Sequence, residues 1–398
     1  MAAEVPASSV FPSPIFPQPA LPHLTITGHF VRTGRVGGAE PMLYNLLQGF
    51  SDIRVKTTLL CGSERDLAPQ FLAQSAGGTL RLLECGGTGT RFVAEQRACL
   101  RPDLSSDAIL FPNYYVPPIV PRRLGRICVV MHDFQYRHFP QYFSAKKRAW
   151  LRLSQEFAMR RADRVIVISD FVRQDAIRLF GRGIAGKLIH IPNAMSWDRF
   201  EGGLDQARPC SRPYILSVAA QYPHKNLETM IRAFQTVARA DADVQLVLCG
   251  QSYDRLHGVA TQGRRKRTDI VAVVEALGLA GRVQFTGHVD DATLAPWYRH
   301  ATMFVFPSLF EGFGMPPVEA LGFGLPTLTT GLTALPEVTQ GLAQAVRNPL
   351  DAAEWASKMS EILCAPGQHR PSADGVAGLK AFYHPTRIAR IYAAALTT

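Results

Sequence analysis

Short apolar segments alternate with helical patterns along this chain, and the alternation occurs twice. Most of the apolar segments are continuous runs rather than strict alternations of apolar and polar side chains. Strands that are covered by helices on both faces have such continuous runs. The pattern therefore predicts an α/β protein built from two doubly wound, Rossmann-like parallel sheets.

The expected elements follow from these periodicities. In the first half, the strands lie at residues 24–30, 55–60, 108–111, 127–131, 165–168 and 188–191. In the second half, they lie at residues 214–218, 244–249, 283–285, 303–306 and 326–329. Helical patterns cover residues 39–50, 145–161, 171–179, 226–240, 291–300, 315–323 and 351–363.

The length of 398 residues favours two domains, because single cores rarely grow beyond about 250–300 residues. Apolar residues make up 47% of the chain and charged residues 19%, which is the balance of a globular protein. Glycine, proline and charge replace the periodicity at residues 201–212, which we interpret as the linker. We therefore place the first domain at residues 21–205 and the second at residues 206–384.

Residues 1–20 are rich in proline and contain no lysine, no arginine and no long apolar run. We interpret them as a disordered leader rather than a signal peptide. No later segment has 18 consecutive apolar residues. None of the seven cysteines forms a CxxC pair, which favours a reducing compartment and argues against a zinc site. We expect a cytoplasmic protein without a bound metal.

Three short segments place candidate ligand-binding residues directly after predicted strands. Gly37 and Gly38 precede the first helix, where they could bind a phosphate or form a simple strand–helix turn. His132 ends the strand at 127–131 and could hydrogen-bond a substrate hydroxyl or be a structural histidine. Lys225 precedes a helix whose N-cap we assign to Asn226. A bound phosphate would explain this lysine, and a surface lysine is the alternative.

The segment of residues 307–319 is the most informative motif. A strand leads into a glycine-rich turn, and a helix with two prolines in its first turn begins near Met315. Glu311 lies in the turn and Glu319 lies on the helix. Glu319 can accept two hydrogen bonds from vicinal hydroxyls, each worth about 1.5–3 kcal/mol. The alternative for Glu319 is a favourable first-turn interaction with the helix dipole. The backbone N–H groups of Phe313, Gly314 and Met315 can point at an oxygen-rich ligand.

The sequence EGFGMPPVEA at residues 311–320, preceded by FPS and followed by LPEV, resembles the donor-binding signature of the retaining family 4 (group 1) glycosyltransferases. Other segments are similar to further family positions in the same order; they are GGAE at 37–40, VISDFV at 167–172, IPNA at 191–194 and PHKN at 223–226. The segment HDFQYRHFPQYFS at 132–144 is similar to bacterial mannosyltransferase-like members. The resemblance spans about residues 24–395.

The resemblance implies the two-domain GT-B fold, with the last segment, residues 385–398, packing back onto the first domain. It implies transfer with retention at the anomeric carbon and no metal requirement. By the same resemblance, Glu311 holds the sugar hydroxyls near the reacting centre, Lys225 neutralises the departing diphosphate, and His132 contacts the transferred sugar.

The resemblance also implies donor-binding residues. Glu319 would bind the nucleotide ribose, and the glycine pair Gly37 and Gly38 would donate to the diphosphate from the opposite domain. The amides that would help Glu311 to hold the sugar are those of Phe313, Gly314 and Met315. No cofactor is implied beyond a nucleotide-diphosphate sugar as co-substrate, and the resemblance of residues 132–144 favours GDP-mannose.

One position departs from the family pattern. Many members carry an arginine five or six residues before the lysine equivalent to Lys225, and here Ala219 and Ala220 occupy those positions. Arg35 and Arg173 are our candidates for balancing the second phosphate. Glu337 could cap a helix or touch the donor, and we favour the structural role.

The acceptor should meet the first domain and is expected to be a saccharide or lipid-linked saccharide. The segment from Lys146 to Arg164 is strongly basic and repeats Trp150, Leu153 and Phe157 at helical spacing. Such a helix can lie on an anionic membrane. We favour the alternative, in which these apolar residues face the core and the basic face is solvated. Peripheral contact with the inner face of the membrane stays open.

Two charged segments do not change this interpretation. Asp241 and Asp243 have the spacing of a metal-binding DxD motif, but they lie in a polar turn and are expected at the surface. The run from Arg264 to Arg267 lacks interleaved aromatic residues, so we expect no nucleic-acid partner. Two other functions remain as alternatives: a nucleotide-sugar epimerase on the same fold and a non-catalytic nucleotide-sugar binder.

Overall fold

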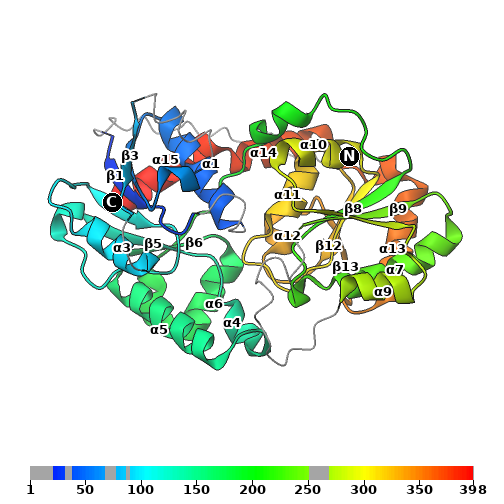
Figure 1. Cartoon of the computed structure of the whole chain (residues 1–398), viewed down its shortest axis with the longest axis horizontal. Helices are drawn as coiled ribbons and strands as arrows, with labels where there is room; N and C mark the ends of the chain where they lie inside the picture. Colours follow the sequence, from blue (N-terminus) through cyan, green and yellow to red (C-terminus); the bar gives the residue numbers. More distant parts are fainter. Residues whose placement is uncertain (1–20, 32–37, 68–77, 87–89, 251–268, 398) are drawn as a thin grey trace, which may run out of the picture.

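The computed structural model describes residues 21–31, 38–67, 78–86, 90–250 and 269–397. The leader expected at residues 1–20 and the basic run from Arg264 to Arg267 lie outside these ranges. Two parallel β-sheets, each with helices packed around it, lie side by side (Figure 1). The predicted α/β fold with two doubly wound, Rossmann-like domains is confirmed.

The first sheet has seven strands in the order β3-β2-β1-β4-β5-β6-β7. All of its neighbouring strands are parallel. The strands are β1 (His23–Thr27), β2 (Lys56–Cys61), β3 (Leu80–Glu84), β4 (Ala108–Phe111), β5 (Arg126–Met131), β6 (Arg164–Val167) and β7 (Leu188–His190). Its helices are α1 (Ala39–Asp52), α3 (Arg91–Cys99), α4 (Gln135–His138), α5 (Ala145–Arg161) and α6 (Asp170–Phe180).

The second sheet has six parallel strands in the order β10-β9-β8-β11-β12-β13. The strands are β8 (Tyr214–Val218), β9 (Gln245–Cys249), β10 (Val283–Gly287), β11 (Met303–Phe306), β12 (Thr327–Thr330) and β13 (Gln344–Val346). The helices that follow β8 are α7 (Leu227–Ala240), α9 (Ile270–Ala276), α10 (Asp291–His300), α11 (Met315–Gly322), α12 (Leu335–Val338), α13 (Ala352–Cys364), α14 (Ala373–Tyr383) and α15 (Pro385–Thr397).

Every strand and helix expected from the sequence is present, with boundaries shifted by a few residues. The sequence analysis did not identify β3, β13, α3, α4, α9, α12 or α14. No helix in the described ranges combines the length and the apolar character that are needed to cross a bilayer.

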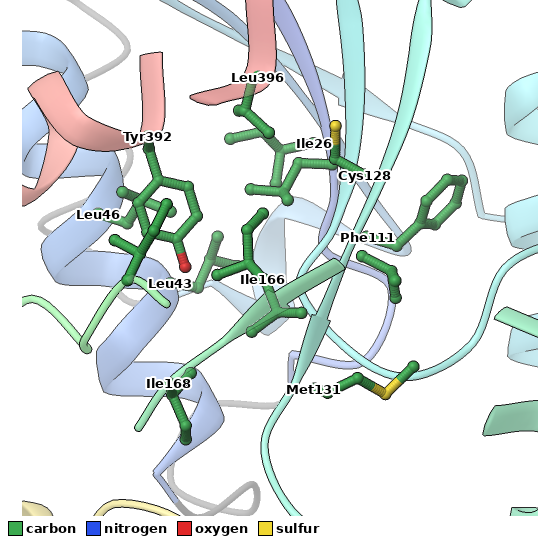
Figure 2. Close-up of a cluster of buried hydrophobic side chains, with 14 of the residues drawn as sticks. Ile26, Leu43, Leu46, Phe111, Cys128, Met131, Ile166, Ile168, Tyr392 and Leu396 are labelled. Carbon is green, nitrogen blue, oxygen red and sulfur yellow. The ribbon is translucent and has the colours of Figure 1, made fainter. Parts of the chain in front are cut away.

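The last helix, α15, packs against the first sheet rather than the second. In Figure 1 it lies beside α1, although the two helices come from opposite ends of the chain. Figure 2 shows Tyr392 and Leu396 of α15 close to Leu43 and Leu46 of α1 and to Ile26 of β1. All five side chains are at most 1% exposed, so α15 completes the core of the first domain.

The contact between α1 and α15 requires a glycine at position 49. A β-carbon there would lie 2.2 Å from the carbonyl oxygen of Pro385. Helix propensity alone would make Gly49→Ala stabilising by about 1 kcal/mol. The steric overlap with Pro385 should outweigh this gain in stability. We therefore expect Gly49→Ala to lower the free energy of unfolding by about 1–3 kcal/mol.

Urea unfolding followed by circular dichroism measures this change. Gly183→Ala is the matched control, because a β-carbon at position 183 meets nothing within 4 Å. A Gly49→Ala protein that is as stable as the wild type would contradict the close packing of α15.

Candidate active site

The loops that carry the candidate residues leave neighbouring strands at the centre of the second sheet. Strands β8 and β11 are adjacent, and the connections from them run to opposite sides because the strand order reverses here. Ligands of doubly wound sheets bind beyond the carboxyl ends of the strands at such a reversal. Lys225 follows β8 and Glu311 follows β11, so the fold brings these two distant residues together.

Lys225 and Glu311 form a direct ion pair. Nζ of Lys225 lies 2.5 Å from Oε1 of Glu311, and the two side chains are only 16% and 13% exposed. Nζ also lies 5.2 Å from the ring centre of Phe306 at the end of β11. The lysine is therefore held at the carboxyl edge of the sheet and is not the surface lysine of the alternative interpretation.

Asn226 does not cap α7 as the sequence analysis expected. It occupies the N-cap position, but its backbone is left-handed with φ at 54°, and its side chain makes no capping hydrogen bond. Nδ2 donates instead to the carbonyl of Pro349, and Oδ1 accepts from the hydroxyl of Thr229. The sequence analysis was right that Asn226 occupies the N-cap position of α7, and it was wrong that the Asn226 side chain caps the helix.

Glu319 is buried on α11 and has a donor at each carboxylate oxygen. Oε1 accepts from the guanidinium of Arg199, and Oε2 accepts from the hydroxyl of Tyr298 at 2.8 Å. The Glu319 side chain is 7% exposed. The residue lies beyond the first turn of α11, so the first-turn dipole interpretation is wrong.

The turn before α11 needs glycine at two positions. Gly314 is the N-cap of α11 and has φ at 94°, and a β-carbon there would lie 2.7 Å from Cδ2 of Leu335. A β-carbon at Gly312 would lie 1.9 Å from the carbonyl oxygen of His132. The turn of the second domain therefore touches the end of β5 in the first domain.

The residues that follow in this turn contact α14 and the start of α1. The ring of Phe313 packs edge-on against Tyr383 of α14, with centres 5.5 Å apart. A β-carbon at Gly38 would lie 3.5 Å from Sδ of Met315. Gly38 precedes α1, so the N-termini of α1 and α11 approach each other. Gly37 lies outside the described residues.

His132 stands at the end of β5 with a defined tautomer. Its Nε2 lies 2.7 Å from the carbonyl oxygen of Pro112, and a carbonyl can only accept. Nε2 therefore carries the proton, and Nδ1 is an acceptor. Burial lowers the pKa of His132, which favours this neutral form. A neutral histidine in this tautomer can accept a hydrogen bond from a sugar hydroxyl.

The neighbouring Asp133 belongs to the same site, although the sequence analysis gave it no role. Burial and the nearby charge of Glu311 raise its pKa, while a backbone hydrogen bond from Gln135 and the charge of Lys225 lower it, and the pKa is raised overall. Asp133 also lies against the turn of the second domain, since a β-carbon at Gly312 would be 3.1 Å from Cβ of Asp133.

Hydrogen bonds between the domains surround this turn. Oγ of Ser169 donates to the carbonyl of Gly312 at 2.7 Å. The carboxylate of Glu337 accepts from the amides of Asp170 and Phe171 at 2.6 and 3.2 Å. Glu337 thus caps α6 across the domain boundary, in agreement with the structural role that we favoured.

Aromatic packing adds to the same boundary. The ring of Phe310 lies 4.8 Å from His138, 5.8 Å from Phe139 and 5.6 Å from Phe171, measured between ring centres. Phe310 comes from the loop after β11, and its three partners come from the first domain. The residue before Glu311 is therefore anchored in the opposite domain.

Two family models match the chain. "Glycosyltransferase Family 4" matches residues 36–199, and "Glycosyl transferases group 1" matches residues 212–365. Together they cover most of both domains. The chain belongs to the family 4 glycosyltransferases.

Several relatives of this family 4 member are mannosyltransferases. O-antigen chain mannosyltransferase B of Escherichia coli is 28% identical over 221 residues, which is 53% of each chain. O-antigen chain mannosyltransferase RfbU of Salmonella typhimurium is 25% identical over 238 residues, or 59% of this chain and 60% of the relative. The matched region thus spans a little over half the length of these relatives.

The solved structures show the fold that this family 4 chain shares. The structure of Anabaena HepE in complex with UDP and glucose superposes with a TM-score of 0.68 at 17% identity. The superposition covers 94% of this chain and 99% of that chain. The GT-B architecture implied by the resemblance is confirmed.

Sequence analysis of this family 4 chain missed Arg199 and Tyr298, the two donors to Glu319. Arg199 is separated from Glu319 by 120 positions, and no local pattern links them. Of the two arginines considered for the second phosphate, Arg173 pairs with Asp170 at 2.6 Å, and Arg35 lies outside the described residues. No three histidine, cysteine, aspartate or glutamate side chains gather as a metal site in the described ranges.

The contact between Gly312 and His132 can be tested by substitution. Gly312→Ala should push the turn away from β5, because the new methyl group would overlap the carbonyl oxygen of His132. We expect a lower midpoint of thermal unfolding and a larger radius of gyration by small-angle X-ray scattering. Gly281→Ala, where a β-carbon meets nothing within 4 Å, is the control. Identical scattering for Gly312→Ala and wild type would refute the contact.

Proposed function

We propose that this chain transfers a hexose from a nucleotide-diphosphate sugar to a saccharide or lipid-linked saccharide, in polysaccharide or glycolipid biosynthesis. The transfer proceeds with retention at the anomeric carbon and without a metal ion. The observation that carries the proposal is the Lys225–Glu311 pair, which stands at the reversal of the second sheet and faces the end of β5 in the first domain.

GDP-mannose is the donor that we favour. The two relatives compared above are named as mannosyltransferases, which supports mannose as the sugar. HepE, which has the same fold, has been solved with UDP and glucose, which supports a nucleotide sugar as the class of donor. The guanine base rests on the resemblance of residues 132–144 alone.

The residue types suit the charges that develop in this reaction. As the bond from the anomeric carbon to the diphosphate breaks, negative charge grows on the leaving oxygen and positive charge grows on the sugar. The ammonium of Lys225 has three donors, so it can keep Glu311 and also donate to the phosphate. Amides at the N-terminus of α11 can stabilise the same negative charge. In the front-face route, the departing phosphate takes the proton of the acceptor hydroxyl.

The remaining site residues hold the substrate. We assign the ribose to Glu319, the sugar hydroxyls to Glu311 and to the amides of Phe313, Gly314 and Met315, and a contact with the transferred sugar to His132. Gly38, together with Gly37, would approach the diphosphate from the first domain. His132 acts through Nδ1, since Nε2 is bonded to Pro112.

Glu311→Gln tests the function. The wild type should release GDP from GDP-mannose and join mannose to an acceptor glycoside, with the anomeric configuration read by NMR. Removing the charge of Glu311 should slow transfer at least about a hundredfold, which is typical of the loss of one electrostatic group. Glu361→Gln is the matched control, because Glu361 is 51% exposed and pairs only with Lys358 among the described residues.

The products separate the alternatives. A nucleotide-sugar epimerase changes the donor without releasing GDP, and a non-catalytic binder leaves the donor intact. UDP-glucose, tested in parallel, shows which of the two donors the protein uses. Failure of the wild type to turn over either donor with any acceptor glycoside would contradict the proposal.

We also propose that the acceptor side of the first domain contacts an anionic membrane. The structure overturns our favoured orientation of α5: Trp150, Leu153 and Phe157 are 42%, 65% and 42% exposed instead of facing the core. The side of α5 that meets the sheet carries a different set of residues, namely Leu151, Ser154, Gln155, Ala158 and Met159.

The exposed stripe continues into a group of aromatic rings. The ring of Trp150 lies 5.0 Å from Phe92 of α3 and 6.3 Å from Tyr115. Basic residues of α5 flank the stripe, and the exposed ones are Lys146, Lys147, Arg152, Arg160 and Arg161. Apolar side chains beside basic ones suit the interface of an anionic bilayer, where each Lys or Arg adds about 1 kcal/mol.

Liposome sedimentation tests this surface. The wild type should sediment with vesicles of equal parts phosphatidylcholine and phosphatidylglycerol at low salt, and less in high salt. Leu153→Ser with Phe157→Ser should weaken binding about tenfold or more, since burying one such side chain is worth about 1.5–3 kcal/mol. Val271→Ser, at a residue that is 47% exposed on α9, is the control. Equal sedimentation of the double variant and wild type would exclude this stripe.

A further inference from the structure

Arg199 lies outside every motif that marks the donor site, yet it contacts the glutamate to which we assign the ribose. It stands in the 3-10 helix Asp198–Gly203, in the segment that joins the two sheets. Its guanidinium donates to Oε1 of Glu319, while Tyr298 of α10 donates to Oε2. Each oxygen of the carboxylate therefore has one fixed donor.

Arg199 is itself held from several sides. Nη1 lies 3.6 Å from Oδ1 of Asp291, and the guanidinium carbon lies 4.4 Å from the ring centre of Phe200. The side chain is 15% exposed. Burial lowers the pKa of Arg199, but the charges of Glu319 and Asp291 outweigh this and raise it. The guanidinium is therefore a fixed positive charge beside Glu319.

The segment that carries Arg199 is also anchored to α11. Nε1 of Trp197 donates to the backbone carbonyl of Glu319 at 3.3 Å. Gly322, one turn further along α11, lies against the indole so closely that a β-carbon there would be 2.0 Å from Nε1. Trp197 lies two residues before Arg199 and fixes the backbone there. Arg199 therefore has little freedom to turn away from Glu319.

We propose that Arg199 is a positioning residue for the ribose of the donor. A carboxylate offers about four lone-pair directions. Arg199 and Tyr298 occupy one at each oxygen, which fixes the carboxylate plane and leaves one direction per oxygen for the two vicinal hydroxyls. The inference rests on the proposed function, since it requires Glu319 to bind a ribose.

The test compares ribose and deoxyribose ligands. Calorimetry gives the dissociation constants of GDP and 2′-deoxy-GDP, and of UDP and 2′-deoxy-UDP, for the wild type and for Arg199→Gln. The quantity of interest is the ratio of the dissociation constant of the deoxyribonucleotide to that of the matching ribonucleotide. For the wild type and the nucleotide pair that binds better, this ratio should be roughly 10–150, the range for one hydrogen bond to a charged group. In Arg199→Gln this ratio should fall towards one. A general loss of structure would weaken both members of a pair alike.

Two further variants complete the design. Arg232→Gln, in an exposed pair with Glu228 on α7, should keep the wild-type ratio. Tyr298→Phe removes the donor at the other oxygen and should lower the ratio as well, so the idea stays testable if Arg199→Gln does not fold. A wild-type ratio that persists in both Arg199→Gln and Tyr298→Phe overturns the positioning role alone. A wild-type ratio near one, or no binding of either nucleotide, overturns the ribose assignment and this inference with it.

Discussion

The candidate site depends on a backbone contact between the domains, the approach of Gly312 to the end of β5. Only a residue without a β-carbon can come so close to the carbonyl of His132. The contact sets the Lys225–Glu311 pair opposite His132 and Asp133. Hydrogen bonds from Ser169 and to Glu337 support it on the same boundary. The main-chain approach of Gly312 therefore sets the spacing of the two halves at this point, and side chains from both domains reinforce it.

Both candidate donor-site glutamates, Glu311 and Glu319, are largely buried next to a cation. Glu311 has Lys225, and Glu319 has Arg199. An unpaired buried carboxylate would be costly, and each pairing offsets that cost. Each pair also leaves acceptor or donor capacity unused, because a carboxylate and an ammonium have more hydrogen-bonding directions than one partner fills. Each ion pair therefore holds its charged groups in place and leaves part of their hydrogen-bonding capacity for a ligand.

The sequence predicted the fold because most strands are continuous apolar runs, and strand order then determined which loops meet. It missed β3, whose five residues include only one buried side chain, and α14, whose two glycines weaken its pattern. It located Glu319 but not Arg199, since nothing local links the two. It could not orient α5, because that helix carries two apolar stripes, and only packing shows that Leu151 rather than Leu153 is buried.

The position of α15 has a consequence for synthesis on the ribosome. The first domain lacks Tyr392 and Leu396 in its core until the chain has been extended through the whole of the second domain. At about 5–20 residues per second, the wait between β7 and α15 lasts roughly 10–40 s. During that time the part of α1 that packs against α15 is uncovered, and a nascent-chain chaperone could bind there.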